Sequence, residues 1–478
     1  MSFKRLCCLL LTIVTISVYA QEVKMPVLNV YFDAKIAKGM PYANGSMTLT
    51  DEDGNVVEMP AKFKTRGATA EHYLKKPSLN MKLRNADYTE EVDSALLGLR
   101  SCSSWILDAM AIDRICMRNR VAFDIWNEFS KLPYETNFDS RNGTEGRFIE
   151  VYINDKYYGI YCLSDRINRK LLDLKKVTEM EDGTMLVRGV LYKSGTREIK
   201  EQTKFGFNED YTACTVSWHN AWELSFPEDY ASEAVWEPLI DAYQNGKTVE
   251  YVKKYFYLTN LADYELHVAA LSIGDNMGNK NHFFSIRNIN KDIDAEDPED
   301  ADRRRFVVTP WDLDTSLGGH YDGQNYDGNY SDWAVSDVAK SAFYPISTIH
   351  NDAQYKAILK QRWIVGRKGA FSPASINQKL EKYRDLFIKS GAWQRMIDRF
   401  GVASSPKLVE DLAKEISLIE KWYEKRFHAM DEYFGITDGI EEIQNDYVNS
   451  KSYHLNGQIV GGHTKGIIIQ NGKKYFVR

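Results

Sequence analysis

The feature that most constrains the fold of this chain is a change in the spacing of its apolar residues near Trp236. Before that point, short segments alternate apolar and polar residues with the period of two that a half-buried strand requires. After it, longer segments repeat their apolar residues at helical spacing. The sequence therefore predicts an α+β fold with a β-rich N-terminal half and a mainly helical C-terminal half.

The N-terminal half is predicted to form strands joined by polar turns, with one or two helices packed on the sheet. Asn154 and Asp155 favour a tight hairpin turn, and Asp51–Asn55 is expected to form another turn. The strands are predicted at residues 27–32, 46–50, 79–83, 147–153 and 157–163, and the helices at residues 113–129 and 165–174.

The C-terminal half is predicted to contain helices with a small hairpin between them and a separate β tail. An acidic segment, residues 291–302, divides the hairpin and is expected to be a solvated loop. The tail after Ser452 has the pattern of short strands with Asn-Gly turns. The helices are predicted at residues 258–273, 352–365, 375–388 and 406–433, and the hairpin strands at 282–287 and 305–309.

The first twenty residues have the layout of a cleavable secretory signal. Lys4 and Arg5 precede an apolar core from Leu9 to Val18, and the segment ends in the small residue Ala20 before Gln21. The core is too short to span a bilayer, and no later stretch is long and apolar enough to do so. We therefore expect an exported protein in the periplasm, on the outer surface or outside the cell, without a transmembrane segment in the mature chain.

The charge and the cysteine spacing argue against nucleic-acid binding and against a zinc site. The chain carries 61 basic and 67 acidic side chains, and loss of the signal would make it still more negative, which argues against nucleic-acid binding. The four cysteines beyond the signal show no Cys-x-x-Cys pairing, so a zinc site is not expected. Their spacing leaves both disulfides and buried thiols open. They are Cys102, Cys116, Cys162 and Cys214.

The domain organisation that follows has four parts. Residues 1–20 are the signal and residues 21–235 a β-rich lobe. Residues 236–440 form a helical lobe that carries the polar loops described next, and residues 450–478 form the β tail.

The strongest local signal is a strand that runs into Pro310 and is followed by two carboxylates, Asp312 and Asp314. In an extended backbone, residues i and i+2 point to one side. Two carboxylates held close together repel each other unless a cation neutralises them, and Mg²⁺ is a suitable partner. A pair of solvated loop acids is the structural alternative.

A second signal lies about thirty residues earlier, where a long helix is expected to end. Asp275, Lys280 and Asn281 follow it within a glycine-containing loop that leads into the next strand. An Asp that accepts a proton, followed shortly by an Asn that holds a metal, is typical of phosphoryl-transfer loops. Taken alone, an Asx-rich turn explains the segment equally well.

Basic residues gather on the N-terminal strands. Lys64 and Arg66 alternate along one predicted strand and share a face, and Lys76 and Lys82 follow. Cations on a sheet facing an acidic metal site would neutralise the phosphates of a bound nucleotide from the other side. Lysine on an exposed strand also serves solubility alone.

The order of these motifs resembles that of the CotH kinase family, which includes spore-coat protein H. The resemblance covers roughly residues 26–320 and depends on the shared order rather than on any one motif. The residues that carry it are Lys64–Gly67, Lys75–Pro77, Leu79–Leu83, Leu97–Leu99, Trp105–Leu107, Asp113, Met117–Asn119, Glu150–Asn154, Tyr158–Tyr161, Asp275–Asn281 and Pro310–Asp314.

The resemblance implies an atypical protein-kinase-like fold of two lobes that binds ATP with Mg²⁺, or Mn²⁺, and phosphorylates serine or threonine of secreted or surface proteins. It places Asp275 as the catalytic acid of the loop and Asp312 in the same catalytic centre. It makes Asn281, Asp312 and Asp314 metal ligands. The nucleotide would contact Lys64, Arg66, Lys76, Lys82 and Asp165, with Lys76 or Lys82 preferred as the phosphate-binding lysine.

Two positions depart from the family pattern. Asp165 stands where the family places a glutamate, and the polar turn after the arginine reads Gly67–Ala70, which removes phosphate-binding donors. A catalytically impaired pseudokinase or a carbohydrate- or surface-binding protein is therefore a second hypothesis, supported also by 10 Trp and 29 Tyr. A glycosyltransferase that uses Asp312 and Asp314 with a metal-bound nucleotide sugar is a third. The tail resembles the short C-terminal β motif of exported bacterial proteins, which implies a sorting or surface-association element. A simple β cap is the structural alternative.

Overall fold

The computed structural model describes most of the chain between Val23 and Val477. The described residues are 23–33, 39–67, 75–134, 136, 139–195, 206–217, 220–278, 280–290, 304–320, 332–340, 344–401, 408–436, 453–454, 466–470 and 473–477. The predicted signal at residues 1–20, the substituted turn at residues 68–70 and the acidic segment at residues 291–302 lie outside them.

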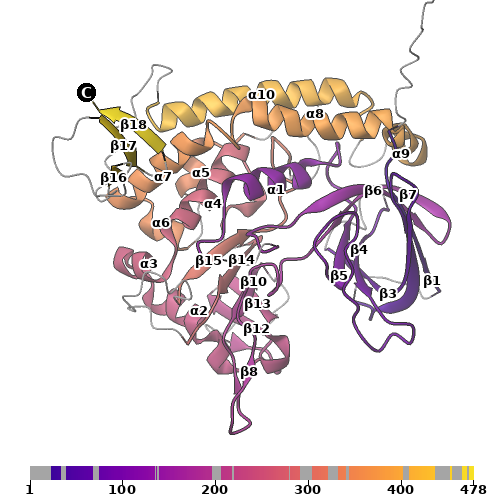
Figure 1. Cartoon of the computed structure of the whole chain (residues 1–478), viewed down its shortest axis with the longest axis horizontal. Coiled ribbons are helices and arrows are strands. Elements are labelled where there is room, and N and C mark those ends of the chain that lie inside the picture. Colours follow the sequence, from indigo (N-terminus) through magenta and orange to yellow (C-terminus); the bar gives the residue numbers. More distant parts are fainter. Residues whose placement is uncertain are drawn as a thin grey trace, which may run out of the picture. The chain divides into compact units, whose positions relative to one another are not determined.

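The N-terminal half folds into a closed seven-stranded barrel in the order β1-β2-β3-β4-β5-β7-β6 (Figure 1). Every pair is antiparallel except β1 and β6, which run parallel and close the barrel. Alternate residues point inward and form one apolar core, which includes Leu28, Met47, Phe63, Met81 and Leu107. The strands are β1 (Val27–Phe32), β2 (Ala43–Thr50), β3 (Val56–Arg66), β4 (Ser78–Leu83), β5 (Ser104–Asp108), β6 (Gly146–Ile153) and β7 (Lys156–Ser164).

The hairpin between β6 and β7 turns as the sequence predicts. Asn154 and Asp155 both have a positive φ, 48° and 64°, and Ile153 pairs with Lys156 across them. This is the backbone that a two-residue hairpin turn needs and that Asn and Asp tolerate best.

A second sheet of six strands follows, in the order β11-β12-β13-β10-β14-β15. The predicted hairpin of the helical half forms its edge, because β10 pairs with β14 and joins the hairpin to strands from earlier in the chain. A separate pair, β8 (Thr178–Glu179) and β9 (Met185–Leu186), forms a small ribbon. The six strands are β10 (Val190–Ser194), β11 (Gly206–Phe207), β12 (Ala213–Ser217), β13 (Asn220–Phe226), β14 (His282–Ile286) and β15 (Phe306–Pro310).

Helix α4 (Leu258–Leu271) is the centre of the helical part. Its residues from Asn260 to Leu271 are all buried, and it packs against α1, α7, α10 and β15. A helix that is buried all round belongs to a core. Figure 1 shows the long helices α8 and α10 side by side above it. The other helices are α1 (Arg118–Phe129), α2 (Glu233–Asn245), α3 (Val249–Tyr255), α5 (Val335–Lys340), α6 (Ile346–Ile349), α7 (Ala353–Gly366), α8 (Pro373–Lys389), α9 (Ala392–Phe400) and α10 (Leu412–Tyr433).

The structure confirms a β-rich N-terminal region and helices in the C-terminal half, with two local differences. The helix predicted at residues 165–174 is wrong: the segment forms turns, in which Asn168 accepts a bond from the Leu171 amide and Asp173 has a φ of 49°. Helix α1 begins at Arg118 rather than at Asp113, because the Asp113 carboxylate binds the amides of Ile115, Met117 and Arg118 and holds a loop ahead of the helix.

The chain divides into two compact units, residues up to Gly435 and residues Ile436–Arg478. The second unit contains three antiparallel strands, β16 (Tyr453–His454), β17 (Gly466–Gln470) and β18 (Lys473–Val477). Within the described ranges, no helix is both long and apolar enough to cross a membrane. Cys102, Cys116, Cys162 and Cys214 are buried free thiols.

Candidate active site

The hairpin β14–β15 brings two of the predicted site residues together. Asn281 directly precedes β14, and Asp312 lies two residues beyond the end of β15. Because the strands are antiparallel and His282 pairs with Pro310, the start of one and the end of the other meet at the same edge of the sheet. The Trp311 amide donates to the Asn281 carbonyl at 2.9 Å and continues the ladder by one bond.

The backbone leaves strand geometry at both residues. Asn281 has a φ of 60° and Asp312 a φ of 57°, in the left-handed region that non-glycine residues seldom adopt. Asn and Asp tolerate this region better than most residues. Such conformations gather at functional sites, where the surrounding structure compensates their strain.

Asp275 joins these residues from the end of α4. The helix ends at Leu271, and the Asp275 amide donates to the Thr315 hydroxyl at 3.2 Å. Asn281 Nδ2 donates to Asp275 Oδ2 at 2.9 Å, and Lys280 Nζ forms an ion pair with Oδ1. The carboxylate is therefore oriented by a neutral donor on one oxygen and by a cation on the other.

Asn276 ties the two loops to each other. Its Nδ2 donates to the carbonyls of Asn281 and Trp311, both at 2.9 Å. Because Asn276 is buried, these bonds have little competition from water. The structure thus brings together four of the predicted site residues, Asp275, Asn281, Asp312 and Asp314.

The carboxylates of this cluster repel each other. The Asp312 side chain lies in a recess of the protein and reaches solvent from there. Desolvation in the recess and the negative charges of Asp108 and Asp275 raise the pKa of Asp312 to about 6, and the positive charge of Arg66 opposes this shift. Burial, followed by the charges of Asp312, Asp108 and Asp275, raises the pKa of Asp314 well above its ordinary value. No hydrogen bond to either carboxylate is present among the described residues.

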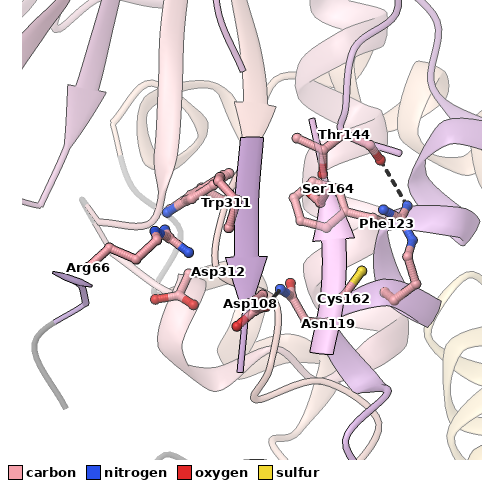
Figure 2. Close-up of a pocket in the computed structure, with 11 residues that line it drawn as sticks. Arg66, Asp108, Asn119, Phe123, Thr144, Cys162, Ser164, Trp311 and Asp312 are labelled. Carbon is pink, nitrogen blue, oxygen red and sulfur yellow. Dashed lines mark hydrogen bonds between the residues drawn. The ribbon is translucent and has the colours of Figure 1, made fainter. Parts of the chain in front are cut away.

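Arg66 is the cation of the barrel that faces the cluster. It ends β3, and its guanidinium lies over the Trp311 ring at 5.2 Å. Desolvation lowers its pKa, while Asp108 and Asp312 act against that shift. Figure 2 shows the guanidinium between the Trp311 ring and the Asp312 carboxylate. The arginine predicted to contact the nucleotide thus lies beside the predicted metal ligand.

Two further polar residues of the site, Asp108 and Asn119, were not predicted. Figure 2 shows Asn119 beside Asp108, and Asn119 Nδ2 donates to Asp108 Oδ2 at 2.7 Å. Asn119 Oδ1 accepts from the Leu313 amide at 3.1 Å. A carboxylate directly after the apolar strand segment 105–107 was the available sequence signal. These residues line a cavity of about 40 Å³ together with Arg66, Ile106, Arg120, Phe123, Thr144, Cys162, Ser164, Trp311 and Asp312.

The predicted lysines have different surroundings. Lys76 is fully buried, and its Nζ donates to the carbonyls of Ala109, at 2.7 Å, and Ile160. Burial lowers its pKa. Lys64 and Lys82 both lie over the Tyr42 ring, at 5.8 and 5.3 Å, and so share one face of the barrel. Lys64 and Lys82 are therefore better placed than the buried Lys76 to meet an anion at the surface.

Asp165, predicted to contact the nucleotide, pairs with Arg100. Its Oδ2 accepts from Arg100 Nε at 3.2 Å and its Oδ1 from the Glu145 amide at 2.9 Å. Burial raises the pKa of Asp165 to about 6, and Arg100 and Arg141 oppose that shift. Arg100, which precedes β5, is therefore the cation that pairs with the short side chain at this position.

The cluster has the donors that a hard divalent cation prefers. Asp312 and Asp314 offer carboxylates whose repulsion a cation would relieve, and Asn281 keeps its Oδ1 for a ligand because its Nδ2 binds Asp275. In the described part of the chain, no three acidic, histidine or cysteine side chains converge to ligand distance. The residue types fit Mg²⁺, while the arrangement leaves several coordination positions to water and phosphate.

Comparison with known families gives a match over most of the chain. The family model described as CotH kinase protein matches residues 63–430, which include both hairpin ends, α4 and Arg66 at the end of β3. No curated protein matches the chain.

Proposed function

The chain belongs to the CotH kinase family, and from that membership we propose that it is an exported protein kinase with a two-lobe, kinase-like fold. It would transfer the terminal phosphate of ATP to serine or threonine of secreted or surface proteins. The observation that carries the proposal is the gathering of Asp275, Asn281, Asp312 and Asp314 beneath Arg66.

Asp275 is the proposed base. Its Oδ2 would accept the proton of the acceptor hydroxyl as the oxygen attacks phosphorus, and the Asn281 amide would keep the carboxylate oriented. Lys280, paired with Oδ1, would help to orient the Asp275 carboxylate and would stabilise negative charge on the phosphate. The hydroxyl proton is then held by Asp275, and ADP departs with the electron pair of the broken bond to phosphorus.

Asp312, Asp314 and Asn281 are the proposed ligands of Mg²⁺, which would offset the charge of the phosphates. Arg66 would contact phosphate oxygens from the barrel side, supported by its contact with Trp311. Lys64 and Lys82 extend the same basic face and would attract the nucleotide.

Export is proposed from the N-terminal segment, in which two basic residues, an apolar core and small residues follow one another. A purified chain beginning at Gln21 is therefore the form to test. Mass spectrometry of the N-terminus of the secreted protein would check the cleavage, and retention of residues 1–20 would contradict it.

The test is a thermal-shift titration with ATP, UDP-sugars and oligosaccharides, each with and without Mg²⁺ or Mn²⁺. A ligand that binds only the folded state raises the Tm by mass action. Metal-dependent stabilisation by ATP, followed by transfer of labelled phosphate to protein, is the expected result. Stabilisation by UDP-sugars or oligosaccharides alone would replace the kinase with one of the other two hypotheses.

Two variants assign the roles. Asp275→Asn should keep ATP-dependent stabilisation and lose transfer by about 10²–10⁴-fold, the usual contribution of a general base. Asp312→Asn should lose both transfer and the metal dependence of the Tm shift. Asp398→Asn, an exposed Asp on α9, is the matched control. Transfer at the control's rate by the purified, folded Asp275→Asn protein would disprove the assignment.

A further inference from the structure

Trp333 presents an exposed aromatic ring next to the proposed base. It lies just before α5, which packs against α4 and α10 (Figure 1), and it is 43% exposed. The ring lies against Gly274, the residue before Asp275. A Cβ built on Gly274 would have three indole atoms as its nearest neighbours, with Nε1 at 2.6 Å. Consecutive Cα atoms are about 3.8 Å apart, so the indole lies within one residue spacing of the Asp275 backbone.

The backbone of Trp333 is fixed from two sides. Its amide donates to the Ser272 hydroxyl at 3.0 Å, at the end of α4, and its carbonyl accepts from Arg426 Nη1. Arg426 is a buried residue of α10 that also donates to Asp332 Oδ1 and to the Ala269 carbonyl of α4, both at 2.9 Å. Because these bonds join the segment to two core helices, the exposed ring is held ready and loses little entropy when it binds a partner.

The charges around the ring are already paired within the protein. Asp275 pairs with Lys280, and Asp332 pairs with Arg426. A ligand side chain of either charge would therefore meet a neutralised pair, whereas an apolar side chain would gain by covering the indole. The Asp275 side chain is 30% exposed, so a hydroxyl group can reach it from solvent.

The ring also lies apart from the proposed contacts of the nucleotide. The described residues that line the recess of Asp312 belong to the barrel, to α1, to the segment before β6 and to the end of β15. Trp333 is attached to α4 and α10 instead. With the phosphates at Asp312, the surface formed by Gly274 and Trp333 is open to the other substrate, the acceptor.

We propose that Trp333 selects the acceptor: its indole packs against an apolar side chain one or two residues from the serine or threonine whose hydroxyl meets Asp275. An extended chain spans about 3.3–3.6 Å per residue, so this side chain reaches the indole while the hydroxyl stays at the carboxylate. The inference rests on the proposed kinase function, because it names the kind of acceptor that the same site takes.

Binding of labelled peptides tests the proposal without phosphate transfer. Short peptides carry one serine flanked by leucine, lysine, glutamate or glycine, and fluorescence anisotropy gives the Kd for the chain beginning at Gln21 in the absence of ATP. The leucine peptide should bind about tenfold more tightly than the glycine peptide. Trp333→Ala should remove most of this difference, and Trp333→Phe, which keeps an aromatic ring, should retain part of it.

Tyr211→Ala is the matched control, and circular dichroism checks the folding of each variant. Tyr211 is an aromatic residue that is 38% exposed, and it lies between β11 and β12, at the edge of the second sheet opposite to β15. Its substitution should leave the affinity for every peptide unchanged. Equal losses of leucine-peptide affinity in Tyr211→Ala and Trp333→Ala would overturn the proposal.

Gly274→Ala moves the indole without removing it. Gly274 begins a 3₁₀ turn, Gly274–Asn276, a backbone that alanine adopts without strain, so the substitution acts through the contact of its Cβ with Trp333. It should weaken binding of the leucine peptide by about threefold or more, with no further loss when Trp333→Ala is already present. Equal losses in both backgrounds would overturn the contact on which the proposal depends.

Transfer of labelled phosphate separates this inference from the proposed function. Trp333→Ala should raise the KM for the leucine peptide by about tenfold and leave kcat and the KM for ATP within about twofold. An unchanged KM for that peptide, or loss of ATP-dependent stabilisation in this variant, would overturn the inference and leave the kinase standing. A wild-type chain that binds the lysine, glutamate or glycine peptide as tightly as the leucine peptide would do the same.

The converse result rejects the proposed function alone. If binding of the leucine peptide depends on Trp333 but no peptide receives phosphate, the kinase is rejected and the peptide-binding role of Trp333 stands.

Discussion

The surroundings of Asp314 disfavour a negative charge on its carboxyl group. Burial and the charges of Asp312, Asp108 and Asp275 all raise its pKa. The folded state therefore binds a proton on Asp314 at pH values where the unfolded chain has lost it, and this carboxyl reduces stability progressively as the pH rises above about 4.

Asp314→Asn should consequently raise the Tm of the metal-free protein at pH 7 to 8, by an amount that shrinks toward zero near pH 4. The same variant should respond less to Mg²⁺, because a proposed ligand is gone. Differential scanning fluorimetry from pH 4 to pH 8 measures both effects, with Asp398→Asn as the control. A Tm below the wild-type value at neutral pH would show that favourable contacts of the Asp314 carboxylate outweigh its burial and the repulsion from its neighbours.

Asp312 should make metal binding depend on pH within the physiological range. The pKa of its carboxyl is raised to about 6 without metal, so a proton competes with the cation below that pH. The apparent Mg²⁺ affinity should be nearly constant from pH 7 to 8 and fall by about tenfold per unit below pH 6. Calorimetric titration with MgCl₂ at each pH tests this, and constant affinity down to pH 5 would contradict the role of Asp312.

At the scale of elements, Asn119 joins three parts of the chain that are distant in sequence. It projects from α1, donates to Asp108 at the end of β5 and accepts from the Leu313 amide after β15. It therefore positions the loop that carries Asp312 and Asp314 against the barrel. Its role is positioning, since it acts on those residues through hydrogen bonds.

Asn119→Ala removes both bonds, each worth about 1 kcal/mol net. The loop should lose its fixed geometry, and we expect kcat for phosphate transfer to fall by about tenfold or more with a smaller change in the KM for ATP. Asn245→Ala, which removes a bond of 2.8 Å within α2, is the control. Equal loss of stability in the two variants together with an unchanged kcat would assign Asn119 a purely structural role.

The sequence could predict the elements whose contacts are local. The apolar runs of α4, β14 and β15 are long enough to be recognised, and the antiparallel hairpin then places Asn281 near Asp312. Closure of the barrel could not be predicted, because β1 pairs with β6 across more than a hundred residues of intervening chain. Lys76 could not be predicted to be buried either, because its Nζ bonds to the carbonyls of Ala109, after β5, and Ile160, in β7, which lie far from it in the sequence.

Two residues of the site, Asp108 and Asn119, were missed for the same reason, because their contacts are distant in sequence. Asn119 lies in the family segment Met117–Asn119 but was given no role, and Asp108 stands outside the family segments; each gains its role from a partner in another element. The turns at residues 165–174 replace a predicted helix because Asp165 is drawn into a pair with Arg100 and the Glu145 amide. Tertiary pairing of polar groups overrides local propensity at such positions.

At the scale of the molecule, helix α9 attaches the helical part to the barrel. Arg395 forms two bonds to the Glu150 carboxylate of β6, at 2.8 and 2.6 Å, and Tyr157 donates to the same group at 2.6 Å. Met396 of the same helix lies against β7 at Gly159. Glu150 is buried, and removing its arginine partner would leave the carboxylate without the cation that it pairs with.

Gly159 is the point at which this attachment can be tested. Its φ is 89°, and a Cβ there would lie 2.0 Å from Met396 Sδ, so alanine meets both backbone strain and a collision with α9. Gly183 has a φ of 80° and no atom within 4 Å of a Cβ, which makes Gly183→Ala a control for the strain alone. The control should cost about 1 kcal/mol of unfolding free energy.

Gly159→Ala should cost about 1–3 kcal/mol more than the control, the usual range for overpacking a tight contact. Urea unfolding followed with one signal from the barrel and one from the helices shows how the loss of stability is distributed between the two. If α9 docking couples the barrel to the helices, barrel and helix signals should still unfold together but at lower urea. If α9 is only an appendage, the Gly159→Ala protein should unfold like the Gly183→Ala protein, and the coupling inferred from the Arg395–Glu150 pair would be wrong.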